Sequence, residues 1–289
     1  MPVQIARTLD VLRTSIAKLR QGGDTLALVP TMGALHDGHL TLVRRAREAC
    51  DHVVASIFVN PTQFGAGEDL DAYPRQLEAD AAMLEAEGCA LLWAPEVEAM
   101  YPGGTADFAT SISVSGVSEG LCGADRPGHF DGVATVVAKL FNQVQPDMAF
   151  FGEKDFQQLA VIRTMARDLD LSAPHPHQII GVPTVREADG LAMSSRNRYL
   201  SDADRAAAAT LPRAMKDAIA ALEGGQDIAA TLAALKDALL GAGFERIDYA
   251  VLADAISLKP LDTLSGHPAR LLVAARIGGT RLIDNMGLG

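Results

Sequence analysis

Hydrophobic positions in the first part of the chain switch repeatedly between helical and strand-like spacing. Apolar residues from Leu9 to Leu19 recur at helical spacing and end before Gly22-Gly23, which is a helix stop signal. The apolar run 26–29 then predicts a buried strand. Segment 40–49 is again helical in pattern, and the β-branched segment 53–59 predicts the next strand. Together these segments predict a strand-helix-strand unit.

The same alternation continues as far as residue 182. Further helices are expected at 75–87, 133–143 and 157–169, and further strands at 91–94, 148–151 and 178–182. Strands separated by helices of this length form a parallel sheet covered on both faces, which is the doubly wound α/β class. In that class ligands bind beyond the carboxyl ends of the strands. The loops that follow the strands are therefore where chemistry is expected.

The regular alternation of strands and helices gives way to a turn-rich segment around the prolines at 174–183, which suggests a second domain. Asp189-Gly190 is a hairpin signal, and Ser201 followed by Asp204 resembles a capping box at the start of an Ala-rich helix. One more helix is expected at 228–240 and strands at 247–252, 271–277 and 281–283. The chain is thus divided into a domain of residues 1–182 and a smaller α+β domain of residues 183–289.

The net negative charge of the chain argues against a nucleic-acid partner. The formal net charge is -11, and nucleic-acid binding requires clustered Lys and Arg that displace counterions from the phosphate backbone. We therefore expect no nucleic-acid partner, and any bound anion should be small and locally recognised.

Cysteine usage and hydropathy suggest the compartment. Cys50, Cys89 and Cys122 have neither metal-ligand nor CxxC spacing, so they are expected to be free, mostly buried thiols in a reducing environment. Residues 1–7 hold no long apolar segment, and no later run approaches the roughly 18 apolar residues that a spanning helix needs. The expectation is a cytoplasmic protein without a membrane partner.

Two histidines bracket a glycine where the first strand leads into a helix. In the loop 30–39, His36 and His39 flank Gly38, and Gly33 precedes them. A helix N-terminus presents free backbone N–H groups, glycines allow a phosphate to approach closely, and imidazoles can donate to its oxygens. The alternative is a capping histidine and a surface histidine. A zinc site is less favoured because no further ligands accompany the pair.

A second loop opens in the same way after the strand at 148–151. Gly152-Glu153-Lys154-Asp155 leads into a helix, and in a doubly wound sheet it should share an edge with the histidine loop. Lys154 could then reach an anionic reacting group. A solvated Lys154 paired with a neighbouring acid is equally compatible with this segment alone.

Three further features involve polar side chains in loops or at a helix start. Ser194, Ser195 and Arg196 place two hydroxyls beside a guanidinium, a combination suited to polyphosphate oxygens, although such tripeptides are common in loops. The amides of Gln63 and Gln158 could hydrogen-bond a hydroxylated substrate without repelling its carboxylate. Surface glutamines without a role are the commoner case.

Taken jointly, several motifs closely resemble the pantothenate synthetase (pantoate:β-alanine ligase) family. The segments are 30–39, 56–64, 73–75, 126–130, 151–158, 182–199 and 282–285. The resemblance spans essentially the whole chain. It implies a Rossmann-like nucleotidyltransferase domain with an HxGH signature, a C-terminal domain that acts as a lid, and a homodimer.

The same resemblance implies the ligands and the residues that bind them. Pantoate, β-alanine and ATP with Mg²⁺ would be the ligands. His39, His36, Lys154 and Arg196 would be catalytic, and Gln63 and Gln158 would hold pantoate. ATP would lie along Met32, Gly33, Ala34, Leu35, His36, Asp37, Gly38, His39, Gly152, Glu153, Lys154, Asp155, Val185, Met193, Ser194, Ser195 and Arg196.

This chain departs from the family pattern near the implied metal ligand. Gln76 stands where Thr is usual, and Ala79 precedes Asp80 where related sequences can carry a second acid. Asp80 is the metal contact implied by the resemblance. The His175-Pro176-His177 run is particular to this chain and is expected to be an exposed loop.

In the implied reaction, ATP activates the carboxylate of pantoate. Pantoate would attack the α-phosphorus of ATP and release pyrophosphate, and β-alanine would then attack the acyl adenylate, so no protein nucleophile is required. The HxGH signature alone also permits an adenylyltransferase acting on a phosphate-bearing substrate, a relative of the aminoacyl-tRNA synthetases, or a nucleotide sensor without catalysis. The acidic balance and the short C-terminal part disfavour tRNA binding.

Overall fold

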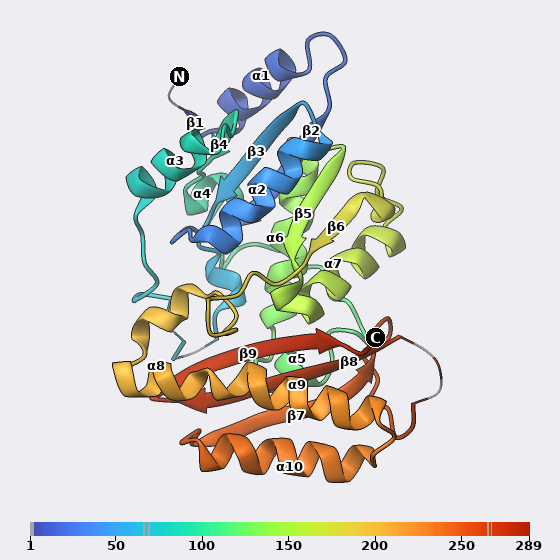
Figure 1. Ribbon diagram of the computed structural model, residues 1–289. Helices are drawn as coiled ribbons and strands as arrows, with labels where there is room; N and C mark the ends of the chain where they lie inside the picture. Colours follow the sequence, from blue (N-terminus) through green and yellow to red (C-terminus); the bar gives the residue numbers. More distant parts are fainter. Residues whose placement is uncertain (1–2, 66, 69, 265, 267) are drawn as a thin grey trace. The chain divides into compact units, whose positions relative to one another are not determined.

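The chain forms two compact units in the computed structural model, which describes residues 3–65, 67–68, 70–264, 266 and 268–289 (Figure 1). Unit 1 consists of Met1–Ser118, Arg126–Glu153 and Gln158–Pro183, and unit 2 consists of Glu119–Asp125, Lys154–Gln157 and Thr184–Gly289. Two short segments that precede residue 183 therefore fold with unit 2.

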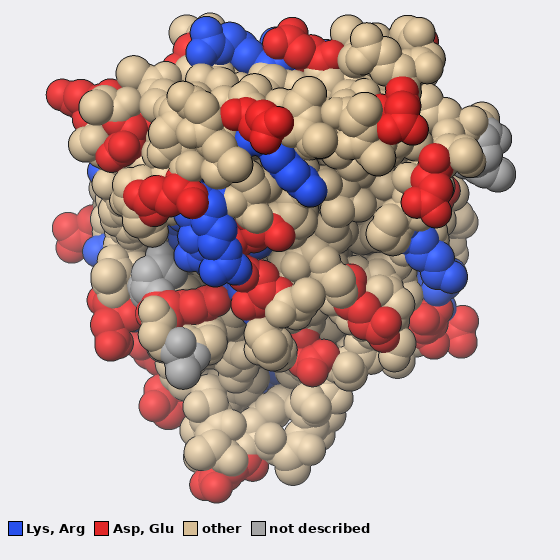
Figure 2. Space-filling view, turned by 90° about the horizontal axis from the view of Figure 1, so that it is seen from below, with Lys and Arg blue, Asp and Glu red and all other residues tan. Residues whose placement is uncertain are grey.

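One face of the molecule shows how its charged side chains are distributed (Figure 2). On the face seen in Figure 2, Lys and Arg side chains lie beside Asp and Glu, and uncharged surface separates these groups. Among the described residues, no helix combines the length and apolar character that a membrane span requires.

Unit 1 is built on a parallel sheet, as the sequence predicts. Its strands are β1 (Gln4–Ala6), β2 (Leu26–Thr31), β3 (His52–Ile57), β4 (Leu91–Trp93), β5 (Met148–Gly152) and β6 (Ile179–Val182). Their order in the sheet is β1-β4-β3-β2-β5-β6, and the pairs are parallel. From β2 the chain runs to β3 and β4 on one side, whereas β5 and β6 lie on the other. The loops after β2 and β5 therefore leave adjacent strand ends at a topological switch point, where doubly wound sheets bind ligands.

Helices cover both faces of this sheet (Figure 1). They are α1 (Leu9–Leu19), α2 (Asp37–Ala49), α3 (Leu77–Ala86), α4 (Val97–Met100), α6 (His129–Val144) and α7 (Phe156–Asp168), whose first two residues fold with unit 2. Leu42 and Val43 of α2 and Leu84 of α3 pack against Val29 and Ala55 of the strands. α1 and α6 contact each other, and α6 also contacts β2.

The structure differs from the expected elements in some of their ends and in several additional short elements, among them β1, α4 and α5 (Leu121–Asp125). β1 was not expected because three residues are too few to show a period of two. α6 begins at His129 rather than at 133, directly after Gly128 at φ 80°, and both His129 and Phe130 are buried. The Ala-rich helix is divided at Ala209 into two, of which the first buries only Ala208 and the second buries a longer apolar face that includes Leu211 and Met215.

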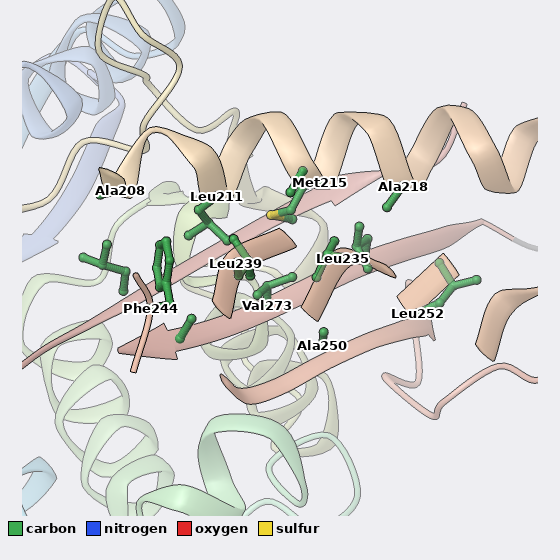
Figure 3. Close-up of a cluster of buried hydrophobic side chains, with 14 of the residues drawn as sticks. Ala208, Leu211, Met215, Ala218, Leu235, Leu239, Phe244, Ala250, Leu252 and Val273 are labelled. Carbon is green, nitrogen blue, oxygen red and sulfur yellow. The ribbon is translucent and has the colours of Figure 1, made fainter. Parts of the chain in front are cut away.

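Unit 2 packs helices against an antiparallel sheet. The strands are β7 (Arg246–Asp254), β8 (Ala269–Ile277) and β9 (Thr280–Gly287), in the order β7-β8-β9, and the helices are α5 (Leu121–Asp125), α8 (Asp202–Ala208), α9 (Thr210–Glu223) and α10 (Ile228–Gly241). Leu211 and Met215 of α9 and Leu235 and Leu239 of α10 meet Val273 of β8 in one buried cluster (Figure 3). This smaller α+β unit is the fold expected for the C-terminal half.

The opposite face of that sheet carries charged side chains beside apolar ones such as Leu272, and it binds two short segments that precede residue 183. Since side chains alternate along a strand, Arg270 of β8 points away from the face that carries Val273. Arg270 lies over the ring of Phe156 at 3.8 Å, and Nε of Arg281 is 2.9 Å from Asp125. Charged and aromatic contacts of this kind explain why Glu119–Asp125 and Lys154–Gln157 fold with unit 2.

Candidate functional site

The loop after β2 is held in an unusual backbone conformation by a buried carboxylate. Gly33 and Ala34 have φ of 84° and 52°, and an L residue such as Ala34 rarely adopts such a value. Asp80 of α3, only 1% exposed, accepts hydrogen bonds from the backbone N of Ala34 (2.8 Å) and Leu35 (2.9 Å). A Cβ at position 33 would lie 3.0 Å from Asp80 Oδ2. Gly33 is therefore needed for sterics as well as for its φ.

Two more side chains complete this anchor. Gln76 Nε2 donates to Asp80 Oδ1 (3.1 Å), so the residue that departs from the family pattern supports the carboxylate one helical turn away. Thr31 Oγ1 accepts from the backbone N of Gly33 (3.2 Å) and donates to the carbonyl of Ser56 on the neighbouring strand (2.7 Å). The loop is thus tied to β3 and to α3.

His36 and His39 lie together at the N-terminus of α2. His36 is the N-cap residue, its backbone N donates to Nδ1 of His39 (3.4 Å), and the two ring centroids are 4.1 Å apart. The capping alternative for His36 is therefore correct as far as the fold is concerned. It does not exclude a ligand role, because a helix N-terminus both requires a cap and attracts anions.

Gln63 is buried next to the start of the histidine loop. Its Nε2 lies 3.0 Å from Sδ of Met32, and its Oε1 accepts from Nδ2 of Asn60 (3.2 Å). Asn60 is itself 1% exposed and accepts from the hydroxyl of Tyr101 (2.8 Å). Unit 1 therefore brings together Gln63, predicted to hold pantoate, and Met32, predicted to contact ATP.

Arg126 and His129, for which the sequence suggested no individual role, hold the backbone of Gln63. Nδ1 of His129 lies 2.8 Å and Nη2 of Arg126 3.4 Å from the Gln63 carbonyl oxygen. Arg126 is fixed in turn by Glu68, at 2.7 and 2.6 Å. The hydrogen bonds from Arg126 lower the pKa of Glu68. The signal in the sequence was the Arg-Pro-Gly-His-Phe segment, whose spacing alone does not reveal which carbonyl it meets.

α6 approaches the Gln63 loop closely through a glycine. A Cβ at Gly132 would lie 2.5 Å from the carbonyl oxygen of Thr62 and 2.7 Å from the backbone N of Gln63. Both are backbone atoms, which cannot move aside as a flexible side chain could. Glycine is therefore the residue type that this contact requires at position 132.

The loop after β5 is divided between the units. Gly152 and Glu153 belong to unit 1, whereas Lys154 and Asp155 fold with unit 2. Nζ of Lys154 is 3.6 Å from Asp155, so the ion pair considered as an alternative is present, although it leaves 21% of the lysine side chain exposed. Such a loose, partly exposed pair contributes little to stability and can exchange partners.

The two adjacent glutamines at the start of α7 differ in their environment. Gln157 is buried, accepts from the backbone N of Cys122 (3.0 Å) and donates to the carbonyls of Glu119 and Gly120. Gln158 is half-buried and belongs to unit 1. Gln157 thus has a structural role, and the ligand role of Gln158 stays a prediction.

The predicted hairpin forms in unit 2 and gathers the remaining candidates. Arg186 pairs with Ala192, and the backbone N of Met193 donates to the carbonyl of Val185 (3.0 Å). Ser194 then caps the short helix η4 (Ser195–Tyr199), its Oγ accepting from the backbone N of Arg196 (3.3 Å). Val185, Met193 and the Ser-Ser-Arg segment are therefore neighbours within this unit.

Asp80 is poorly suited to bind a metal. Its carboxylate already accepts from two backbone N–H groups and from Gln76, and it is almost fully buried. Among the described residues, no group of three or more His, Cys, Asp and Glu side chains is arranged to hold a metal ion. A metal role for Asp80 stays a prediction, and its contacts weigh against it.

The cysteines are free and buried, as expected. Burial raises the pKa of Cys89 to about 11, so its thiol stays protonated at neutral pH. His175 and His177 are exposed, as predicted, and Nδ1 of His175 accepts from the backbone N of His177 (3.3 Å) in a short turn of helix.

Comparison with known proteins shows which proteins the chain is similar to. The sequence profile of the family described as Pantoate-beta-alanine ligase matches residues 4–287. Pantothenate synthetases of Novosphingobium aromaticivorans and Rhizorhabdus wittichii are 67% and 62% identical to the chain, over 99% of each sequence.

Solved structures agree with the sequence comparison. A crystal structure of pantothenate synthetase from Thermus thermophilus has a TM-score of 0.89 at 48% identity, over 98% of this chain and 99% of that one. A pantoate-beta-alanine ligase from Francisella tularensis, complexed with beta-gamma ATP and beta-alanine, has a TM-score of 0.80 at 32% identity, over 98% and 97% of the two chains.

Proposed function

Since the chain belongs to the pantoate–β-alanine ligase family, we propose that the polar residues described above are the ones that carry out its reaction. The chain condenses (R)-pantoate with β-alanine at the expense of ATP, through a pantoyl adenylate, and yields pantothenate, AMP and pyrophosphate. The observation that carries the residue assignment is the buried Asp80 carboxylate, which holds the HxGH loop at the sheet's switch point.

ATP is proposed to bind along the two glycine-containing loops and the hairpin. Gly38 presents a backbone N–H group, and His36 and His39 present imidazoles, at the N-terminus of α2, where the helix dipole favours negative charge. Lys154 and Arg196 add two cations from unit 2. Arg suits phosphate oxygens because its guanidinium can donate two parallel hydrogen bonds.

In the first step the pantoate carboxylate attacks the α-phosphorus and pyrophosphate departs. Negative charge accumulates on the phosphoryl oxygens and on the leaving group, and His39, Lys154 and Arg196 are proposed to stabilise it. In the second step the amine of β-alanine attacks the acyl carbon, so that an amide forms and AMP leaves. Here the protein orients the reactants and excludes water from the adenylate.

Pantoate is proposed to lie at Gln63 and Gln158. The Gln63 side chain is fixed by Asn60 and lies against Met32, so its amide is preorganised beside the proposed ATP loop. Uncharged amides can bind hydroxyl groups and a carboxylate without the repulsion that an acid would cause. His129 and Arg126 act behind Gln63 by holding its backbone.

Three further assignments follow from the family. Mg²⁺ would accompany ATP on its own phosphates, because magnesium needs few protein ligands when a polyphosphate supplies oxygens. The described residues do not offer a built site for it. A homodimer and a cytoplasmic location are proposed on the same basis, and sedimentation equilibrium of the purified chain tests the dimer.

Pyrophosphate exchange tests the catalytic assignment. His39→Ala and Lys154→Ala should each slow pantoate-dependent exchange of labelled pyrophosphate into ATP by about 10²-fold, the scale of losing a charge-stabilising donor. His177→Ala and Lys236→Ala, both exposed, are matched controls that should leave the rate unchanged. Near-normal exchange in either test variant would remove that residue from the mechanism. Exchange supported by a phosphorylated acceptor instead of pantoate would favour an adenylyltransferase.

A further inference from the structure

A dipeptide at the end of the chain lies far in sequence from the proposed site residues yet touches them. Asp284 and Asn285 belong to β9 and are 2% and 3% exposed. Neighbouring residues of a strand point to opposite faces, so these two side chains reach different segments of unit 2. Neither has a role in the reaction as proposed above.

Asn285 holds the backbone at Lys154. Its Nδ2 donates to the carbonyl oxygen of Lys154 (2.8 Å), and its Oδ1 accepts from Nε of Arg270 (2.5 Å). Arg270 is itself stacked over Phe156. Because the amide is bound at both ends, it can neither flip nor rotate without breaking a hydrogen bond, and the Lys154 carbonyl is fixed with it.

Asp284 holds the hairpin that carries Val185 and Met193. Its two oxygens accept from Nη1 and Nη2 of Arg186 at 2.7 and 2.9 Å, and its side chain is fully buried. Arg186 Nη1 also donates to the carbonyl of Gly190 (3.0 Å) across the turn. The backbone N of Asn285 donates to Asp284 Oδ1 (2.7 Å), so the two anchors are joined.

We propose that Asn285 is a positioning residue for Lys154, and that Asp284 does the same for the hairpin through Arg186. This inference rests on the proposed role of Lys154. A lysine side chain has a flexible four-carbon stem, so the accuracy with which Nζ is placed depends on how firmly its backbone is held. The dipeptide thereby connects the last strand of unit 2 to the two segments of that unit proposed to bind ATP.

A double-mutant cycle separates positioning from general stability. Asn285→Asp keeps an acceptor for Arg270 but replaces the donor to the Lys154 carbonyl with an oxygen. We expect it to slow pantoate-dependent pyrophosphate exchange by about 10- to 100-fold, the scale of a small misplacement at a reacting centre. In a Lys154→Ala background the same substitution should have almost no further effect, because the residue it acts through is gone.

Two additional variants keep the test decisive. Arg270→Met removes the donor that orients the Asn285 amide without altering Asn285, and it should give a smaller loss that also disappears with Lys154→Ala. Thr231→Val removes a buried hydrogen bond of α10, from Thr231 Oγ1 to the Asp227 carbonyl (2.8 Å), and should lower the melting temperature without slowing exchange.

The possible failures are distinguishable. Normal exchange in Lys154→Ala alone would overturn the role of Lys154 and with it this inference. Slow exchange in Lys154→Ala, combined with an Asn285→Asp effect of equal size in both backgrounds, would overturn the positioning role only. An Asn285→Asp variant with a lower melting temperature but normal exchange, as expected for Thr231→Val, would also overturn the positioning role.

Discussion

At Asp80 one carboxylate accepts hydrogen bonds from Ala34, Leu35 and Gln76 while almost fully buried. The backbone strain at Ala34 persists because these bonds hold it. We propose that Asp80 acts on the reaction through the shape of the loop that it holds. Metal ligation by Asp80, which the family resemblance implied, would be a different use of the same acid and stays a prediction.

Asp80→Asn is the substitution that tests the anchor. Its amide N–H would face one of the backbone N–H groups, so we expect a loss of about 1–3 kcal/mol in the free energy of unfolding, the cost of an unsatisfied buried donor. Pyrophosphate exchange should fall as well. Urea unfolding monitored by circular dichroism measures the first effect, and exposed Glu78→Gln on the same helix is the control. Restoration of exchange by excess Mg²⁺ would instead indicate a metal ligand.

At the scale of elements, α6 and the residues just before it position the Gln63 loop through contacts of two kinds. Gly132 permits the backbones to touch, and Arg126 with His129 binds the Gln63 carbonyl. Arg126 can do this because Glu68 orients its guanidinium from the other side. The ion pair therefore supports a proposed substrate contact as well as stability.

The Arg126–Glu68 pair should make stability depend on pH. Because Arg126 lowers the pKa of Glu68, the pair stabilises the fold above the unfolded-state pKa of about 4.3, and this contribution is lost as pH falls through the lower folded-state value. Glu68→Gln should cost on the order of 1 kcal/mol at pH 7, after allowance for solvent screening. Its melting temperature should converge with that of the parent towards pH 3.

The exposed pair Arg45–Glu48 provides the control for that measurement. Both side chains are more than half exposed, at 61% and 63%, so Glu48→Gln should leave the melting temperature unchanged across the same pH range. A constant difference between Glu68→Gln and the parent from pH 7 to pH 3 would contradict the assignment.

At the scale of the whole molecule, the proposed ATP residues belong to two units with separate cores. Met32 to His39 lie in unit 1, and Lys154 and Met193 to Arg196 lie in unit 2. A ligand that binds the folded chain stabilises it by mass action, by about 2.7 kcal/mol at a concentration of 100 times its Kd. ATP should therefore raise the melting temperature.

Arg196→Ala tests whether unit 2 contributes to that stabilisation. Differential scanning fluorimetry should show a smaller ATP-dependent rise in melting temperature for Arg196→Ala than for the parent, because one phosphate donor is lost. Exposed Arg213→Ala on α9 is the matched arginine control. An equal rise in all three proteins would show that Arg196 does not bind ATP.

The sequence by itself determined the doubly wound sheet, the α+β character of the C-terminal half and the hairpin at Asp189-Gly190. These features depend on local periodicity and on turn residues, which act over a few positions. The ends of α6, the three-residue β1 and the division of the Ala-rich helix escaped prediction because burial against distant segments decides them.

The family resemblance supplied candidate residues, but only the tertiary structure showed what holds them in place. Asp80 and Ala34 are separated by 46 positions in the sequence. The separation is 66 positions for His129 and Gln63, and 131 positions for Asn285 and Lys154. A side chain's hydrogen-bond partner at such a separation depends on strand order and on the side of the sheet each helix takes. Neither is encoded in the spacing of the motif itself, so the supporting residues became visible only when the chain was folded.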